Sequence, residues 1–96
     1  DHITIGEKAI VSQGAQLCGG THDINDPDFQ LITQPIRIGP QAWVAADAFI
    51  GPGVTVQEGA VIGARAVLFK DAEAYGVYAG NPAVRIKTRL FRKDAP

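Results

Sequence analysis

Residues 32–73 read ITQPIRIGPQAWVAADAFIGPGVTVQEGAVIGARAVLFKDAE, and in them an aliphatic side chain recurs at every sixth position. The aliphatic positions are Ile32, Ile38, Val44, Ile50, Val56, Ile62 and Leu68. Mostly small residues recur four positions later, at Ile36, Ala42, Ala48, Val54, Ala60, Ala66 and Ala72. A helix face repeats about every 3.6 residues and a strand face about every two, so neither element explains this period. A hexapeptide period is typical of a parallel β-helix, in which each repeat supplies one short strand and one corner.

The same phase is present near the start of the chain, where Ile5, Val11 and Leu17 continue the aliphatic series. Between the two segments, Asp23–Leu31 holds three Asp, one Asn and one Pro. This composition does not suit an interior strand and predicts a loop extruded from a corner. We therefore expect a single all-β domain with first repeats at 3–22, the extruded loop at 23–31, main repeats at 32–73 and a C-terminal extension at 74–96, in which Val84–Phe91 forms a strand or a short helix.

The expected stack is short. With three hexapeptides in each coil the chain holds about four coils, and at ~4.7 Å per coil the stack is ~20 Å tall. The first coil of such a stack leaves an open backbone edge, and terminal repeats normally need a cap. We therefore expect self-association, upstream residues of a longer protein, or both, to cover this edge.

Composition narrows the function further. The 96 residues carry a net charge of −1, which argues against a general nucleic-acid binder. The sequence has no apolar run of about 18 residues, so no membrane span is expected. One cysteine excludes an internal disulfide and is compatible with the cytoplasm, which is the expected location. Five of the nine basic residues lie near the end and form either a solvated tail or a phosphate-binding patch: Arg85, Lys87, Arg89, Arg92 and Lys93.

His22 is the candidate catalytic residue, because it lies where the last early repeat meets the extruded loop. Loop corners often carry catalytic groups, and a neutral imidazole can accept a proton from a hydroxyl near neutral pH. The adjacent Asp23 could orient the ring or raise its basicity. A plain surface histidine is the competing interpretation.

Cys18 directly follows an interior aliphatic position and is interpreted as a small packing residue, or less favourably as a nucleophile paired with His22. His2 fits an exposed end residue. Two histidines twenty residues apart do not have the usual spacing of zinc ligands. The aspartates of the loop lack the glycine and glutamate of a calcium-binding loop, so we expect no metal.

Trp43 falls at an outward position of its repeat, and an exposed indole there indicates contact with another subunit or a flat ligand. Lys70 lies near the end of the regular coils. Together with Lys87 it could neutralise phosphate groups.

Three segments together resemble the hexapeptide-repeat acyltransferases with a left-handed β-helix: Ile36-Arg-Ile-Gly-Pro-Gln-Ala-Trp-Val44, Ile50-Gly-Pro-Gly-Val-Thr-Val56 and Val61-Ile-Gly-Ala-Arg-Ala-Val67. Lys70-Asp71 and Tyr78-Ala-Gly-Asn-Pro-Ala83 are similar to the end of the sugar and xenobiotic O-acetyltransferases of that family. The segment Cys18-Gly-Gly-Thr-His-Asp-Ile-Asn-Asp-Pro-Asp-Phe29 most resembles the colanic-acid-biosynthesis type.

The resemblance implies a homotrimer with active sites between neighbouring subunits and acetyl-CoA along the late coils. His22 matches the family's general base, which deprotonates the acceptor hydroxyl for direct attack on the thioester, and Asp23 lies beside it. The residues expected to line acetyl-CoA are Trp43, Ala45, Gly63, Ala64, Lys70, Ala79, Gly80 and Lys87.

The leading hypothesis is therefore an acetyl-CoA-dependent O-acetyltransferase acting on a sugar or polysaccharide precursor. An acetyltransferase for a xenobiotic or antibiotic hydroxyl is one alternative, and a trimeric scaffold without catalysis is another. A zinc hydratase built on the same coil is remote, because it needs three converging histidines and this sequence contains two.

Overall fold

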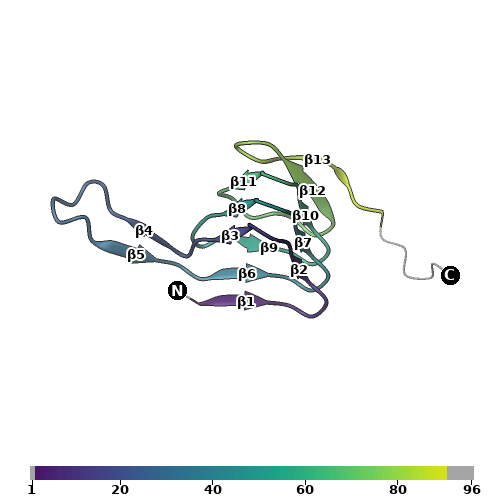
Figure 1. The fold of residues 1–96 in the computed structure, drawn as a ribbon, viewed down its shortest axis with the longest axis horizontal. Coiled ribbons are helices and arrows are strands. Elements are labelled where there is room, and N and C mark those ends of the chain that lie inside the picture. The colour runs from purple at the N-terminus through teal and green to yellow at the C-terminus, as the bar shows by residue number, and fades with distance from the viewer. Residues whose placement is uncertain (1, 91–96) are drawn as a thin grey trace.

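The computed structural model describes residues 2–90, which wind into a left-handed parallel β-helix of stacked three-sided coils (Figure 1). No helix in this part of the chain is long and apolar enough to cross a membrane. The three complete coils consist of β1 (Ile3–Ile5), β2 (Ile10–Val11), β3 (Gln16–Leu17), then β6 (Ile36–Ile38), β7 (Trp43–Val44), β8 (Phe49–Ile50), then β9 (Thr55–Val56), β10 (Val61–Ile62) and β11 (Val67–Leu68). Three further strands are β4 (Gly20–His22), β5 (Leu31–Thr33) and β12 (Gly76–Ala79), and β13 (Val84–Thr88) follows.

The coils form three flat faces. Face A contains β1, β6 and β9, face B contains β2, β7, β10, β12 and β13, and face C contains β3, β8 and β11. Within each face the coil strands pair in parallel, and Val44 lies opposite Ile62 as Ile50 lies opposite Leu68. Both pairs join positions that are three hexapeptides apart, which confirms the predicted size of the coil. The last coil is shorter, because Ile62 pairs with Tyr78 before a third hexapeptide is complete.

Both residue series of the repeat point into the coils. Val44, Ile50 and Ile62 are fully buried, as are the corner alanines Ala48 and Ala60. Aliphatic side chains stack on the equivalent side chains of the next coil, and burial of this apolar surface is the main favourable term in folding. The small corner residues let the backbone turn over that column.

The corners use left-handed backbone conformations that the repeat pattern does not indicate. Between faces A and B, Gln41, Gly59 and Tyr75 have φ values of 60°, 71° and 60°, and each donates its N–H to a carbonyl of the preceding coil. A side chain at Gly59 would collide with the Tyr75 ring, because a Cβ there would lie 2.2 Å from Cε1. Arg89 continues this row by donating its N–H to the Tyr75 carbonyl.

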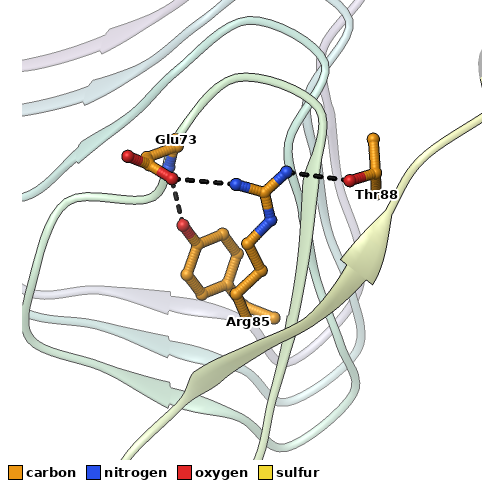
Figure 2. A network of polar contacts seen from close by, with 4 residues as sticks. Glu73, Arg85 and Thr88 are labelled. Carbon is orange, nitrogen blue, oxygen red and sulfur yellow. Dashed lines mark hydrogen bonds and ion pairs between the residues drawn. The ribbon is translucent and has the colours of Figure 1, made fainter.

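The C-terminal end of the stack is closed by the hairpin of β12 and β13, which turns at the cis Asn81-Pro82 peptide bond. Arg85 on β13 donates to Glu73, which precedes β12, at 2.8 Å and to Thr88 of its own strand at 2.9 Å (Figure 2). The Tyr78 hydroxyl accepts a hydrogen bond from the Glu73 N–H at 2.9 Å. The C-terminal extension therefore forms a strand and not a helix over Val84–Thr88, while Phe91 lies outside the described residues.

The N-terminal end of the stack is open. Ile3 and Ile5 pair with the fully buried Ile36 and Ile38, yet they are 44% and 50% exposed. Among residues 2–90 no coil covers these interior positions, which matches the open edge expected for the first coil.

The extruded segment is longer than the predicted 23–31. β4 and β5 form an antiparallel hairpin in which His22 pairs with Leu31 and Thr21 with Ile32. Ile32 was expected to begin the main repeats, but it is 39% exposed in this hairpin. The coil resumes at Ile36, which donates its N–H to the His2 carbonyl. A hairpin can hold an aliphatic residue in phase with the repeat without placing it in the coil interior.

Replacing Ile50 by Ala should lower the free energy of unfolding by about 2–5 kcal/mol, because the side chain is fully buried between two coils. Chemical denaturation measures this loss. Ile24→Ala is the matched control, since Ile24 is 80% exposed, and its effect should stay within about 0.5 kcal/mol. Equal losses for the two variants would contradict the described core.

Candidate active site

The β4–β5 hairpin projects from the corner between faces C and A, away from the stacked coils (Figure 1). Its base is joined by a hydrogen bond from the Gln34 N–H to the Gly19 carbonyl at 2.8 Å. Its tip consists of two successive turns. Asp26 donates its N–H to the Asp23 carbonyl at 3.2 Å, and Phe29 donates its N–H to the Asp26 carbonyl at 2.9 Å.

His22 lies exposed on β4, and its ring is held by the tip of its own hairpin. Nδ1 lies 2.7 Å from the carbonyl oxygen of Phe29. A carbonyl oxygen only accepts hydrogen bonds, so Nδ1 carries the hydrogen in this contact. The neutral ring then keeps its lone pair on Nε2, and this nitrogen is able to accept a proton.

Asp23 lies next to His22 in the chain, but its carboxylate shapes the loop. Its Oδ1 accepts a hydrogen bond from the Asn25 N–H at 3.0 Å, and its own N–H donates to the Gln30 carbonyl at 2.9 Å. The contact that orients the His22 ring therefore comes from Phe29, where the sequence suggested Asp23. Periodicity and residue type gave no signal for a backbone carbonyl in this role.

Most of the residues expected to bind acetyl-CoA lie on face B or at its edge. Ala45 donates its N–H to the Ile62 carbonyl, and Gly63 donates its N–H to the Tyr78 carbonyl. Ala45, Gly63 and Ala79 therefore succeed one another along the end of face B, with Ala64 and Gly80 next to them in the chain. The strip, which we call the small-residue edge, consists of Ala45, Gly63, Ala64, Ala79 and Gly80.

Trp43 lies on the outer surface of face B and is 43% exposed. Its indole Nε1 donates to the Ser12 hydroxyl at 2.9 Å, which holds the ring against the preceding coil. Strand register places Ile10, Trp43, Val61 and Val77 in one outward row across face B. This apolar row is the surface on which the sequence predicted a contact.

The structure does not bring the two predicted lysines together. Lys70 follows β11 at the end of face C, whereas Lys87 lies on β13 opposite Val77. Two arginines of the basic C-terminal group have structural contacts. Arg85 forms the ion pair with Glu73, and Arg89 Nη1 donates to the Gln41 and Gly59 carbonyls at 2.8 and 3.0 Å. The expected basic patch also included Arg92 and Lys93, which lie outside the described residues.

The remaining candidates have simpler settings. Cys18 is a half-buried free thiol whose N–H donates to the Ile50 carbonyl, so it still belongs to the coil. His2 is exposed at the open end of the stack. Within residues 2–90, no three His, Cys, Asp or Glu residues are grouped so that they could hold a metal ion.

His22 and the small-residue edge lie on different parts of the molecule. The hairpin that carries His22 extends from one side of the stack, while β12 and β13 lie on the other side (Figure 1). A single chain therefore presents a proton acceptor and an apolar face separately.

Several known proteins are similar to this chain in sequence. No family model matches the sequence. The chain is 46% identical over 88 residues to the putative colanic acid biosynthesis acetyltransferase WcaF of Escherichia coli, a match that covers 92% of this chain and 48% of that protein. It is also 50% identical over 53 residues to a chloramphenicol acetyltransferase of Agrobacterium fabrum, covering 55% of this chain and 25% of the relative.

Solved structures agree with these sequence matches. A galactoside acetyltransferase in complex with coenzyme A is 27% identical and superposes with a TM-score of 0.84, over 96% of this chain and 50% of that one. A hexapeptide-repeat acetyltransferase of Vibrio cholerae, complexed with acetyl coenzyme A, shares the fold with a TM-score of 0.87 at 24% identity, over 93% of this chain and 50% of that one. The chain spans about half the length of these relatives. It is therefore homologous, over that half, to the hexapeptide-repeat acetyltransferases.

Proposed function

We propose that this chain forms the catalytic part of an acetyl-CoA-dependent O-acetyltransferase that modifies a hydroxyl of a sugar or polysaccharide precursor. The observation that carries the proposal is the setting of His22, whose Nδ1 contacts the Phe29 carbonyl while the residue is exposed on a projecting hairpin. An unengaged surface histidine would have no such contact.

The reaction needs one base and one aligned thioester. His22 Nε2 takes the proton from the acceptor hydroxyl as the oxygen attacks the carbonyl carbon of acetyl-CoA. The carbon–sulfur bond then breaks, and the departing CoA sulfur takes up the proton from the imidazolium. A general base of this kind typically contributes ~10²–10⁴-fold, and alignment of the two reactants supplies much of the remaining acceleration.

Acetyl-CoA would lie along face B of the later coils. The small-residue edge carries no bulky side chain, so a pantetheine arm can approach the backbone there. Lys87 on β13 would meet the nucleotide phosphates, and Lys70 would reach them from another subunit or from the far end of face C. Both the galactoside acetyltransferase and the Vibrio cholerae acetyltransferase were solved with coenzyme A or acetyl coenzyme A, which supports this ligand.

A trimer would complete the site. Because the His22 hairpin and face B lie on different sides of one chain, a cleft that contains both requires the hairpin of a neighbouring subunit. The outward apolar row around Trp43 provides a surface for such packing. Three subunits arranged in this way would form three identical sites at their boundaries.

The matches to relatives leave two classes of acceptor. The colanic acid and galactoside enzymes favour a sugar, and the similarity to WcaF covers most of this chain. The chloramphenicol acetyltransferase match favours an antibiotic hydroxyl, but it covers only 55% of the chain. A scaffold without catalysis would keep the coils and has no need for the ring contact at His22.

Acetyl-CoA binding tests the proposal most directly. At a concentration where sedimentation shows trimer, calorimetric titration should give a micromolar dissociation constant. Trp43 is the sole tryptophan of the chain, so its fluorescence should change during the same titration. A confirmed trimer that binds no acetyl-CoA would favour the scaffold, and a monomer with full affinity would contradict a site shared between subunits.

Replacing His22 by Ala tests the base. The turnover number should fall at least a hundredfold with acetyl-CoA binding nearly intact, because the ring acts on the acceptor proton. His2→Ala is the matched control, since this exposed histidine belongs to the first coil and not to the hairpin, and the change should leave turnover unchanged. Similar turnover for wild type and His22→Ala would show that another group removes the proton.

A further inference from the structure

We propose that Asp26 is a positioning residue for His22: its side chain fixes the turn that presents the Phe29 carbonyl to Nδ1 and so selects the tautomer with a proton-accepting Nε2. The structural part of this inference concerns the hairpin alone. Its consequence for catalysis rests on the proposed function.

Asp26 is the point at which the two turns of the hairpin tip meet. Its N–H donates to the Asp23 carbonyl at 3.2 Å, and its carbonyl accepts from the Phe29 N–H at 2.9 Å. Its side-chain Oδ1 accepts from the Asp28 N–H at 2.9 Å, which closes the second turn on itself. Asp26 is half-buried, whereas Asp28 is exposed. One residue therefore joins both turns through its backbone and its side chain.

The second turn must hold Phe29 in an unfavourable backbone conformation. Phe29 has a φ of 49°, in the left-handed region that residues with a Cβ rarely adopt. Its side chain is 58% exposed, so burial contributes little to holding it there. Two hydrogen bonds that Asp26 accepts, from the Phe29 N–H at its carbonyl and from the Asp28 N–H at its carboxylate, are local contacts that help to fix the orientation of Phe29.

The orientation of Phe29 matters because its carbonyl decides which ring nitrogen carries the hydrogen. A neutral imidazole free in water prefers the hydrogen on Nε2, and in that form Nε2 donates and cannot accept. The 2.7 Å contact from Nδ1 to the Phe29 oxygen requires the opposite tautomer. If the turn loosens, the Phe29 carbonyl moves away from Nδ1. The tautomer with hydrogen on Nδ1 is then no longer favoured, even though His22 itself is unchanged.

The Asp26 side chain acts through the position of its oxygen, and substitution can separate position from charge. Asp26→Asn removes the charge but keeps an oxygen at the same distance from the backbone. Asp26→Glu keeps the charge but moves the oxygen by one methylene. Asp28→Asn removes one charge from the same loop without removing the N–H that Asp26 binds, and it is the matched control.

Nitrogen-15 NMR of histidine-labelled protein reads the tautomer without any substrate. The chain contains two histidines, so the His2→Ala variant assigns the His22 signals. At a pH where the ring is neutral, we expect hydrogen on Nδ1 in the wild type, in Asp26→Asn and in Asp28→Asn. In Asp26→Glu the tautomer with hydrogen on Nε2 should become the more populated of the two neutral forms.

Three results would overturn the inference: a wild-type ring with hydrogen mainly on Nε2, an Asp26→Glu spectrum equal to wild type, or a tautomer change in Asp26→Asn as large as in Asp26→Glu. The last result would assign the effect to charge. The hairpin lies outside the hydrophobic core, so the variants should keep the coil. If Asp26→Glu nevertheless fails to fold, Asp26→Ala replaces it: this variant removes the oxygen that accepts from the Asp28 N–H and should raise the Nε2 fraction in the same way, and an unchanged spectrum would overturn the inference.

Kinetics add a second measurement. Asp26→Glu should lower kcat about tenfold, a fraction of the ~10²–10⁴ expected from the base, with the KM for acetyl-CoA unchanged. Asp26→Asn should keep the wild-type kcat, because it keeps an accepting oxygen at the same distance from the backbone. An equal KM effect in both variants would indicate general damage to the loop and contradict positioning. If His22→Ala is fully active, the proposed function fails, while the NMR result still tests the positioning role.

Discussion

The return of each coil to the same face after three hexapeptides is the constraint on which the rest of this structure depends. It places Ile50 directly over Leu68 and Val44 over Ile62, so that the same positions supply both the hydrophobic column and the parallel hydrogen bonds. A residue added to or lost from one coil would turn every later side chain away from its position. Departures from the period are therefore confined to corners and to the last coil, where β12 returns early and pairs Tyr78 with Ile62.

The corner between faces C and A shows how the fold admits an insertion. Gln34 bonds to Gly19 at the base of the hairpin, and Ile36 then bonds to His2, so the parallel ladder resumes as if the hairpin were absent. All buried side chains among residues 2–90 are apolar except for the hydroxyl of Tyr78, so the coil interior offers no group for chemistry. Reactive side chains must lie on the outer faces, at corners or on an insertion.

The sequence predicted the coil well because periodicity reports directly on burial. The aliphatic and small series from Ile38 to Leu68 are buried as expected, and Trp43 lies outward. The pattern failed at Ile32, since an antiparallel hairpin and a coil strand can both place an aliphatic residue at the same spacing. The left-handed corners at Gln41 and Tyr75 were also missed, because their side chains are not those that usually indicate a positive φ.

The candidate site was only partly predictable for a related physical reason. Side-chain type identified His22, but the group that orients its ring is the backbone carbonyl of Phe29. Every residue has such a carbonyl, so only the fold distinguishes this one from the others. Asp23 and Asp26 looked alike in sequence, yet hydrogen bonding separates them, because one begins the first turn and the other joins both turns. A hairpin outside the core cannot rely on packing to hold a ring, so its local hydrogen bonds must do so. The orientation of the His22 ring is then set by the turn and not by the coil.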